Sequence, residues 1–434
     1  MRSPVKLMED SRERFGETFT LRMARVGALV FISDPQSIKK LFAADRENGL
    51  PEGRAVLLEP VLGPRSLLLL EGDQHLRSRK LMLPPFHGER MRAYEAVMAQ
   101  AADRELDSWP TGERFPLHPR MQAITLEVIL RAVFGIDDPA RRERLSELLV
   151  RILNVTSSPR AQVIGLAARR LGRLGPYRRL QTVLDETDAV LFEQIAERRA
   201  DQDLDGRDDI LSMLVAARFE DGEPMSDDEV RDQLVTLLFA GHETTATALA
   251  WAFDLLFRNP EAMERLRAEL AEGHDGYLDA VTTETLRIRP VVPSVGRLLT
   301  SKANLGGFEL RKGTAVMPSI YLVHTRADLY PDPYEFRPER FLEGAPDTFS
   351  WIPFGGGTRR CLGAAFASFE MKVVLRTILR RAALRPATDR PEPYGHRNVT
   401  LSPRNGTPAI LERRLAAPPT GAPEPDGARV PSAI

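Results

Sequence analysis

Cysteine is nearly absent from this sequence, because the 434 residues contain only Cys361. A single thiol excludes an internal disulfide framework and any zinc or iron–sulfur site that needs several cysteines. Long apolar runs are lacking as well, since no stretch reaches the roughly 18 uninterrupted apolar residues of a membrane helix. The N-terminal segment 1–15 is charged and has no apolar core of signal-peptide type. We therefore expect a cytoplasmic protein without a membrane anchor.

An excess of charge of one sign is lacking too. The chain has 60 Lys and Arg against 61 Asp and Glu, so its formal net charge is −1. This balance gives no bulk attraction to nucleic acid or to an anionic membrane, and we expect no nucleic-acid partner. A hydrophobic content of 43% and a charged content of 28% are typical of a globular protein.

Helical periodicity dominates the chain, and the segments that resemble strands are short and scattered. Strands are expected at 18–23, 28–33, 295–299, 308–310 and 315–317, and helices at 34–42, 277–289 and 362–381, with further helical stretches over 76–134 and 141–200. The longest predicted helix runs from Ser226 to about Arg258. Ser226 and Glu229 form a capping-box signature at its start, and Pro260 follows its end.

No flexible linker divides the chain before its last residues. The segment 416–434 is rich in Pro, Ala and Gly, and we expect it to be disordered. The pattern predicts a mainly α fold with small β-sheets (α+β). Residues 1–415 would form a single large helical domain with a β-rich N-terminal part.

The surroundings of Cys361 set it apart from an ordinary buried thiol. It follows three consecutive glycines, Gly355 to Gly357, and two arginines, and it lies at the predicted start of a helix. Glycines permit close backbone approach, and a helix N-terminus with adjacent cations favours the thiolate, the form that binds metals. On composition alone, a structural thiol and a metal ligand carry equal weight.

A second unusual segment lies in the apolar middle of the longest predicted helix. Here Gly241, Glu243, Thr244 and Thr245 interrupt an otherwise apolar run. Buried polar groups are costly unless they are partnered, and buried threonine can distort its own helix. A hydroxyl and a carboxylate at such a place could hold an oxygen species and relay protons. The alternative is a polar cluster on a surface.

Both segments resemble signatures of one family. The spacing Phe-x-x-Gly-x-Arg-x-Cys-x-Gly of residues 354–363 resembles the heme-binding loop of the cytochrome P-450 family, and residues 240–245 resemble its Ala-Gly-x-Asp/Glu-Thr-Thr signature. The resemblance implies heme b (iron protoporphyrin IX), with Cys361 as the axial metal ligand. It also implies that Thr244 positions dioxygen and that Glu243 supplies protons. The other residues implied beside the heme are Phe354, Gly355, Gly363, Ala240 and Gly241.

The same resemblance assigns a structural role to Glu284-x-x-Arg287 and to Arg340. In the family these three form a buried charge network that holds the heme loop in register. The spacing alone is weak, since a solvent-exposed pair at i and i+3 is the default for such residues.

Heme carboxylates need cations, and the resemblance implies four partners. These are His75, Arg79, Arg297 and Arg359. The residues that contact the substrate are harder to predict from the sequence. The candidates are Val291, Val292 and Val295, together with Ala240 and Thr244, within substrate-facing segments at about 48–70, 151–180, 239–243, 291–295 and 398–401. An apolar run is more often part of the hydrophobic core than part of a ligand-binding pocket.

The implied activity is monooxygenation of a hydrophobic small molecule. One atom of dioxygen would enter a C–H or C=C bond, with electrons from a separate ferredoxin or flavodoxin and its reductase. The expected docking residues are Arg77, Lys80, Arg90, Arg92 and Arg360, and we expect a monomer. Three alternatives stay open: a peroxide-driven peroxygenase, a non-catalytic heme protein, and a helical protein with no cofactor. The sequence leaves open the substrate, the site of attack and whether the natural start lies upstream.

Overall fold

The computed structural model describes residues 4–23, 27–49, 54–88, 90–157, 176–204, 206–344, 346–397 and 399–415. The chain forms two compact units. Unit 1 comprises Met1–Pro51, Met98–Ile124 and Thr244–Ile434, and unit 2 comprises Glu52–Val97 and Thr125–Glu243. A single domain over residues 1–415 stays a prediction, and the tail 416–434, for which we expect disorder, lies outside the described residues.

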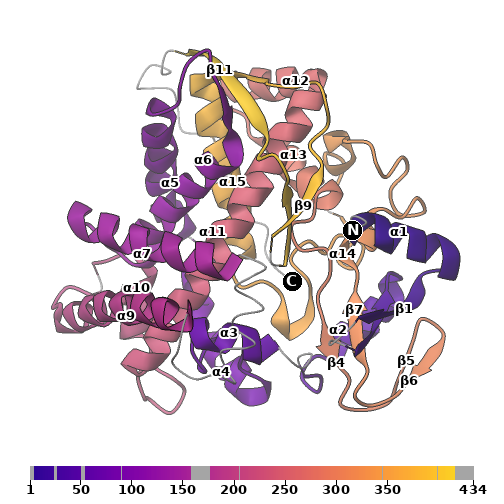
Figure 1. Ribbon diagram of the computed structural model, residues 1–434, viewed down its shortest axis with the longest axis horizontal. Helices are drawn as coiled ribbons and strands as arrows, with labels where there is room; N and C mark the ends of the chain where they lie inside the picture. Colours follow the sequence, from indigo (N-terminus) through magenta and orange to yellow (C-terminus); the bar gives the residue numbers. More distant parts are fainter. Residues whose placement is uncertain are drawn as a thin grey trace. The chain divides into compact units, whose positions relative to one another are not determined.

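Unit 1 contains a four-stranded mixed sheet (Figure 1). Its order is β1 (Thr18–Met23), β2 (Gly27–Ile32), β7 (Ala315–Pro318) and β4 (Arg297–Leu298). Strands β2 and β7 pair in parallel, whereas the two outer pairs are antiparallel. Each of the four lies on, or within one residue of, a segment for which the sequence predicts a strand, so those predictions are confirmed.

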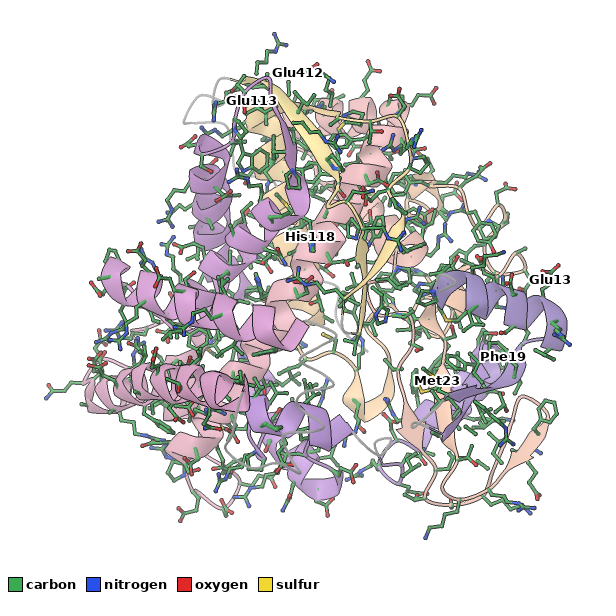
Figure 2. The ribbon with its side chains drawn as sticks, in the orientation of Figure 1. Glu13, Phe19, Met23, Glu113, His118 and Glu412 are labelled. Carbon is green, nitrogen blue, oxygen red and sulfur yellow. The ribbon has the colours of Figure 1, made fainter. Side chains whose placement is uncertain are left out.

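Alternation along β2 explains why this sheet is buried on both faces. Val30 and Ile32 belong to one hydrophobic core cluster, and Leu29 and Phe31 belong to another. Successive side chains of a strand point to opposite faces, so the four apolar residues 29–32 contribute two side chains to each core cluster. Phe19 of β1, which is labelled in Figure 2, stacks on Phe31, and the ring centroids are 5.4 Å apart.

The described part of unit 1 also contains helices and three smaller sheets. The helices that lie wholly within it are α1 (Pro4–Phe15), α2 (Pro35–Ala43), α12 (Pro260–Ala271), α13 (Gly276–Ile288), α14 (Ile320–His324) and α15 (Ala364–Arg381). The sheets pair β3 (Arg114–Pro116) with β11 (Pro408–Arg414) and β8 (Ala382–Pro386), β9 (Tyr394–Arg397) with β10 (Thr400–Pro403), and β5 (Ala303–Leu305) with β6 (Phe308–Leu310). The predicted helices at 34–42, 277–289 and 362–381 correspond to α2, α13 and α15.

Helix α1 and strands β8 to β11 are absent from the sequence-based expectations. Helix α1 buries only Val5, Met8 and Ser11, a narrow stripe among charged residues. Strand β11 is stabilised by a partner that is distant in the chain, since Pro408 pairs with Pro116. Local patterns carry little signal for either kind of element.

Unit 2 is helical. Among its described residues, its own helices are α3 (Arg54–Leu62), α4 (Gly72–Met82), α7 (Pro139–Ser157), α9 (Pro176–Ala200) and α10 (Ile210–Ala216), with a 3-10 turn at Pro84–Phe86 and a π-helical turn at Ile129–Val133. Three further helices run from one unit into the other: α5 (Arg90–Asp107), α6 (Leu117–Val128) and α11 (Asp227–Arg258). None of the helices in the described part of the chain is both long enough and apolar enough to cross a membrane.

Helix α11 confirms the strongest secondary-structure prediction. It has 32 residues, which correspond to about 48 Å at 1.5 Å per residue. The capping box is present, because the backbone N–H of Ser226 donates to Glu229 Oε2 at 2.8 Å and the N–H of Glu229 donates to Ser226 Oγ at 3.3 Å. Most side chains along the helix are buried on all sides.

Candidate functional site

The glycine loop presents Cys361 at the surface of the described chain. The Cys361 side chain is exposed, and its backbone N–H donates to the Phe354 carbonyl at 2.9 Å. Gly355 and Gly357 have φ of 69° and 70°, values that side chains rarely tolerate. Helix α15 begins at Ala364, so Cys361 precedes the helix by three residues instead of opening it. The loop, and not the helix end, sets the position of the thiol.

Arg297 and Arg359 lie close to this loop in unit 1. Arg297 is buried on β4 and donates through Nη2 to Asp45 Oδ2 at 3.0 Å and to the Gly356 carbonyl at 3.1 Å. The backbone N–H of Arg359 donates to the same Asp45 carboxylate at 3.3 Å. The predicted carboxylate partner Arg297 is therefore largely engaged by a carboxylate of the chain itself. Asp45 is a site residue that sequence reasoning missed.

The middle of α11 has one open face. Leu237, Gly241 and Thr244 are partly exposed and Ala240 is exposed, whereas most residues on the other sides of the helix are buried. These four positions follow the i, i+3, i+4, i+7 spacing of a single helix face. Glu243 beside them is also partly exposed. The sequence-predicted polar segment thus lies where a long buried helix becomes accessible.

His242, which we do not expect to be a metal ligand, is buried on another side of the same helix. Its Nδ1 lies 3.0 Å from the Thr125 hydroxyl, which also donates to the His242 carbonyl at 3.1 Å. An ideal Cβ on Gly241 would lie 3.4 Å from Ile129 Cδ1, just within ordinary contact. The surrounding protein alone therefore does not require glycine at position 241.

Glu370 on α15 is a second residue that sequence reasoning missed. Its side chain is 2% exposed and hydrogen-bonds to Thr245, the residue after Thr244. Burial raises the pKa of Glu370 to about 8, against the opposing effect of that hydrogen bond. Its Oε1 atom is buried without a hydrogen-bond partner among the described residues. A buried carboxylic acid therefore contacts the polar segment of α11 at Thr245.

Glu284, Arg287 and Arg340 come together in unit 1. Arg287 donates to Glu284 through Nε at 2.6 Å and Nη2 at 2.8 Å, and both side chains are wholly buried. Arg340 donates through Nε to Glu284 Oε1 at 3.2 Å. The backbone N–H of Arg337 donates to the same oxygen at 2.9 Å. The Glu284 carboxylate is thus surrounded by donors from its own helix and from one distant segment, which contains Arg337 and Arg340.

His324 links this network to the segment before the glycine loop. Its Nδ1 lies 3.1 Å from the Arg287 carbonyl, and the N–H of Ile352 donates to its Nε2 at 2.9 Å. Since Nε2 accepts, the ring is neutral with its proton on Nδ1. Burial, and then the Arg287 charge, lower the pKa of His324 to about 3. Ile352 lies two residues before Phe354, so this buried imidazole connects α13 to the loop.

The two remaining predicted carboxylate partners lie in unit 2. His75 is buried and Arg79 is partly buried on α4, at the i and i+4 positions of one face. The neighbouring cations on α4 face acids of the same unit. Arg77 forms a 2.6 Å ion pair with Asp221, and Lys80 pairs with Glu220.

The predicted substrate residues divide by burial. Val291 is buried, and its carbonyl accepts from the Leu401 N–H at 2.8 Å, as in ordinary core. Val292 and Val295 are partly exposed, and an ideal Cβ on Gly355 would lie 3.6 Å from Val295 Cγ1. Val295 therefore lies against the loop that carries Cys361. Parts of the substrate-facing segments at 48–70, 151–180 and 398–401 lie outside the described residues.

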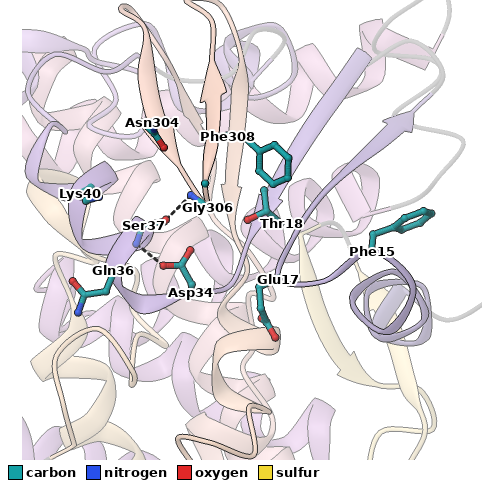
Figure 3. A pocket seen from close by; sticks show the side chains of 11 residues that line it. Phe15, Glu17, Thr18, Asp34, Gln36, Ser37, Lys40, Asn304, Gly306 and Phe308 are labelled. Atoms are coloured by element: carbon teal, nitrogen blue, oxygen red, sulfur yellow. Dashed lines mark hydrogen bonds between the residues drawn. The ribbon is translucent and has the colours of Figure 1, made fainter.

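A separate open hollow of about 390 Å³ occurs elsewhere in unit 1 (Figure 3). Asp34 and Ser37 of its lining are engaged in local hydrogen bonds, from Ser37 N to Asp34 Oδ1 at 2.8 Å and from Gly306 N to Ser37 Oγ at 2.7 Å. None of the sequence-predicted site residues is among its lining residues. It is therefore distinct from the candidate site.

Comparison with known proteins identifies the family. Residues 2–408 match the family described as cytochrome P450. A Mycobacterium tuberculosis protein that carries the name cytochrome P450 135B1 is 43% identical over 412 residues, which cover 94% of this chain and 87% of that protein. Another from the same species, named cytochrome P450 137, is 39% identical over 394 residues, which cover 91% and 83%.

Solved structures agree with this assignment. The retinoic acid-bound cyanobacterial CYP120A1 is 26% identical, with a TM-score of 0.78 and coverage of 94% of each chain. A mutant heme domain of cytochrome P450DA, at 22% identity, shares the fold with a TM-score of 0.82 and coverage of 95% and 94%. The predicted fold class, mainly α with small β-sheets, is confirmed. The chain belongs to the cytochrome P450 family.

Proposed function

We propose that this protein is a heme-thiolate monooxygenase that oxidises a hydrophobic small molecule. One atom of dioxygen would enter a C–H or C=C bond of the substrate, and the other would leave as water. The observation that carries the proposal is the exposed side chain of the single cysteine, held in a glycine loop that matches the family's heme-binding pattern. A bound heme would supply the activation of dioxygen, which a thiolate ligand promotes.

Two features of the structure suit a large cofactor. The thiol of Cys361 is accessible, although the loop that carries it is partly buried. The Leu237–Ala240–Gly241–Thr244 face of α11 is open within an otherwise buried helix. We assign Cys361 as the iron ligand, and His75, Arg79, Arg297 and Arg359 as the residues that hold the heme carboxylates. The loop residues Phe354, Gly355 and Gly363 would pack beside the ring.

The proton chemistry falls to Thr244 and Glu243. The Thr244 hydroxyl can donate and accept hydrogen bonds at the open face of α11, and the Glu243 carboxylate can exchange protons with solvent because it is partly exposed. This acid–alcohol pair argues against a peroxygenase, which has no need of delivered protons. It also argues against a protein that only binds heme.

The substrate is proposed only as a class. Val295 supplies apolar surface beside the loop, Val292 is partly exposed, and the solved cyanobacterial relative is described as bound to retinoic acid, a hydrophobic molecule. Terpenoid, steroid, fatty acid and polyketide scaffolds all agree with such a lining. The residues do not distinguish among them.

Electrons are proposed to come from a separate ferredoxin or flavodoxin with its reductase. Of the five candidate docking cations, Arg77 and Lys80 already pair with Asp221 and Glu220. Arg90 and Arg92 are exposed on α5 and become the better candidates. Reversing both charges should slow electron transfer from the partner, and unchanged transfer rates would reject this placement.

Turnover by purified, heme-loaded protein tests the proposal. Candidate hydrophobic substrates are first screened for a shift of the heme spectrum, and each that binds is incubated with ferredoxin, reductase and NADPH. We expect an oxygenated product that contains ¹⁸O from ¹⁸O₂ and requires the reductase. Equal turnover from peroxide alone would favour the peroxygenase, and binding without any product would favour the non-catalytic alternative.

A further inference from the structure

Asp45, two residues after the end of α2, forms a buried ion pair with Arg297. Their side chains are 0% and 4% exposed, and both Arg297 Nε and Nη2 donate to the carboxylate, the latter at 3.0 Å. Such a bidentate pair fixes the plane of the guanidinium. The remaining contacts of Arg297 go to the carbonyls of Gly296 at 3.0 Å and Gly356 at 3.1 Å.

The same carboxylate shapes the loop that carries Cys361. Besides the Arg359 N–H at 3.3 Å, the Thr358 hydroxyl lies 3.5 Å from Asp45 Oδ2. An ideal Cβ on Gly357 would lie only 2.2 Å from that oxygen, and φ of Gly357 is +70°. A side chain at position 357 is therefore excluded by Asp45 as well as by the backbone conformation.

Helix α2 also explains a second glycine of the loop. An ideal Cβ on Gly356 would lie 2.4 Å from Phe42 Cδ2, and the Arg297 guanidinium lies over the Phe42 ring, 5.3 Å from its centroid. The end of α2 is thus the surface against which Gly356 and Gly357 pack. The close approach for which these glycines are needed is to α2.

The ion pair between Arg297 and Asp45 also determines the net charge beside the loop. Arg297 and Asp45 together carry no net charge, and the pair is buried where solvent screens little. If the Asp45 charge were removed, the net charge beside the loop would become more positive by one unit. A positive charge near a heme favours the reduced iron over the oxidised iron.

We propose that Asp45 is a positioning residue for the heme, which fixes Arg297 and the Gly357–Arg359 backbone and neutralises the Arg297 charge. This inference rests on the proposed heme-thiolate function. Asp45 touches neither substrate nor reacting atoms in this account, and it acts through Arg297 and the loop. The fixed geometry and the cancelled charge make separate predictions.

The test compares reduction potentials of heme-loaded variants. Asp45→Asn keeps the shape of the side chain and should shift the potential in the positive direction. Arg297→Gln should shift it in the negative direction, and the double variant should return near the wild-type value because the neutral pair restores zero net charge. Asp328→Asn is the matched control, since Asp328 pairs with Arg326 through both oxygens, at 3.0 and 2.8 Å, but is 62% exposed.

Geometry is tested by heme retention. Asp45→Ala removes every acceptor, so heme transfer to apomyoglobin should be faster by about 10- to 100-fold, the usual cost of losing an outer-shell group. If Asp45→Asn or Asp45→Ala does not fold, the double variant is measured in its place. A double variant that folds but differs in potential from the wild type would contradict the proposal.

Failure of this inference is distinguishable from failure of the proposed function. If the wild-type protein binds no heme or shows no thiolate spectrum, the proposed function fails first. If the wild type is a normal heme-thiolate protein and Asp45→Asn has the potential and heme retention of Asp328→Asn, only the role of Asp45 is rejected.

Discussion

The Glu284 carboxylate and the Arg287 guanidinium form a wholly buried pair on one face of α13, with Nε and Oε2 2.6 Å apart. Arg340 adds a third charge at 3.2 Å. Replacement of Glu284 by Ala should lower the free energy of unfolding by about 3–5 kcal/mol, because it leaves a buried guanidinium without its counter-ion. Denaturant unfolding measures this loss directly.

The matched control is Glu193→Ala. Glu193 is 62% exposed and lies 3.8 Å from Arg141, so its loss should cost less than about 1 kcal/mol. If Glu284→Ala were no more destabilised than this control, the buried network would not stabilise the fold.

His324 should make the fold sensitive to acid. Burial and the Arg287 charge lower its pKa to about 3, whereas an unfolded chain has the ordinary value of about 6.5. The unfolded state therefore binds more protons between these values. The stability contributed by neutral His324 is present above about pH 6.5 and is lost as the pH falls, by up to about 1.4 kcal/mol per pH unit.

Unfolding of His324→Gln between about pH 4 and pH 7 checks the assignment. The variant should lose about half of the slope that the two buried histidines provide, because His118, with a pKa lowered to about 4, still contributes its own share. His274→Gln, at a side chain that is 69% exposed, should keep the wild-type slope. Identical slopes for His324→Gln and the wild type would contradict the buried neutral imidazole.

Glu370 should have the opposite pH dependence. Burial raises its pKa to about 8, so the folded state holds a proton that the unfolded state releases above about pH 4.5. Its contribution to stability is complete in acid and is lost as the pH rises through about 8. Glu370→Gln should be more stable than the wild type at about pH 8.5. Exposed Glu343→Gln should match the wild type there, and a Glu370→Gln protein that is destabilised to the same degree at every pH would reject the prediction.

Thr244→Ala tests the proton-delivery role. We expect the variant to bind heme and to consume reducing equivalents, but to divert them to peroxide or water. Product formed per electron pair should fall by about 10²-fold or more, the usual contribution of positioned acid–base groups. Thr283→Ala, at an exposed hydroxyl on α13, is the control. Well-coupled product formation by Thr244→Ala would show that its hydroxyl is dispensable.

Local sequence patterns predict much of this molecule, and their limits are physical. Helix α11 and its capping box depend on neighbours in the chain, and the strands of the mixed sheet coincide with short segments whose local sequence resembles a strand, so all of them were predictable. Asp45 was not, because its partner Arg297 is 252 residues away. In the sequence, a single Asp after a helix looks like any solvated carboxylate.

The roles of Glu370 and His324 could not be predicted from the sequence for the same reason. The function of each depends on burial against a distant segment, Thr245 for Glu370 and Ile352 for His324. For two of the predicted docking cations, the sequence suggests a free charge that the structure shows to be paired. Arg77 and Lys80 are basic in sequence, but acids from another loop already pair with them.

The identity of the metal ligand is the central claim, and the spectrum of the reduced, carbon monoxide-bound protein tests it most directly. The account predicts a Soret band at the long wavelength that is typical of thiolate ligation, and its loss in Cys361→Ser and Cys361→His. Because Cys361 is the only cysteine in the chain, no other thiol can replace it. A wild-type band at the shorter wavelength of imidazole ligation, or a thiolate-type band that survives in Cys361→Ser, would contradict the account.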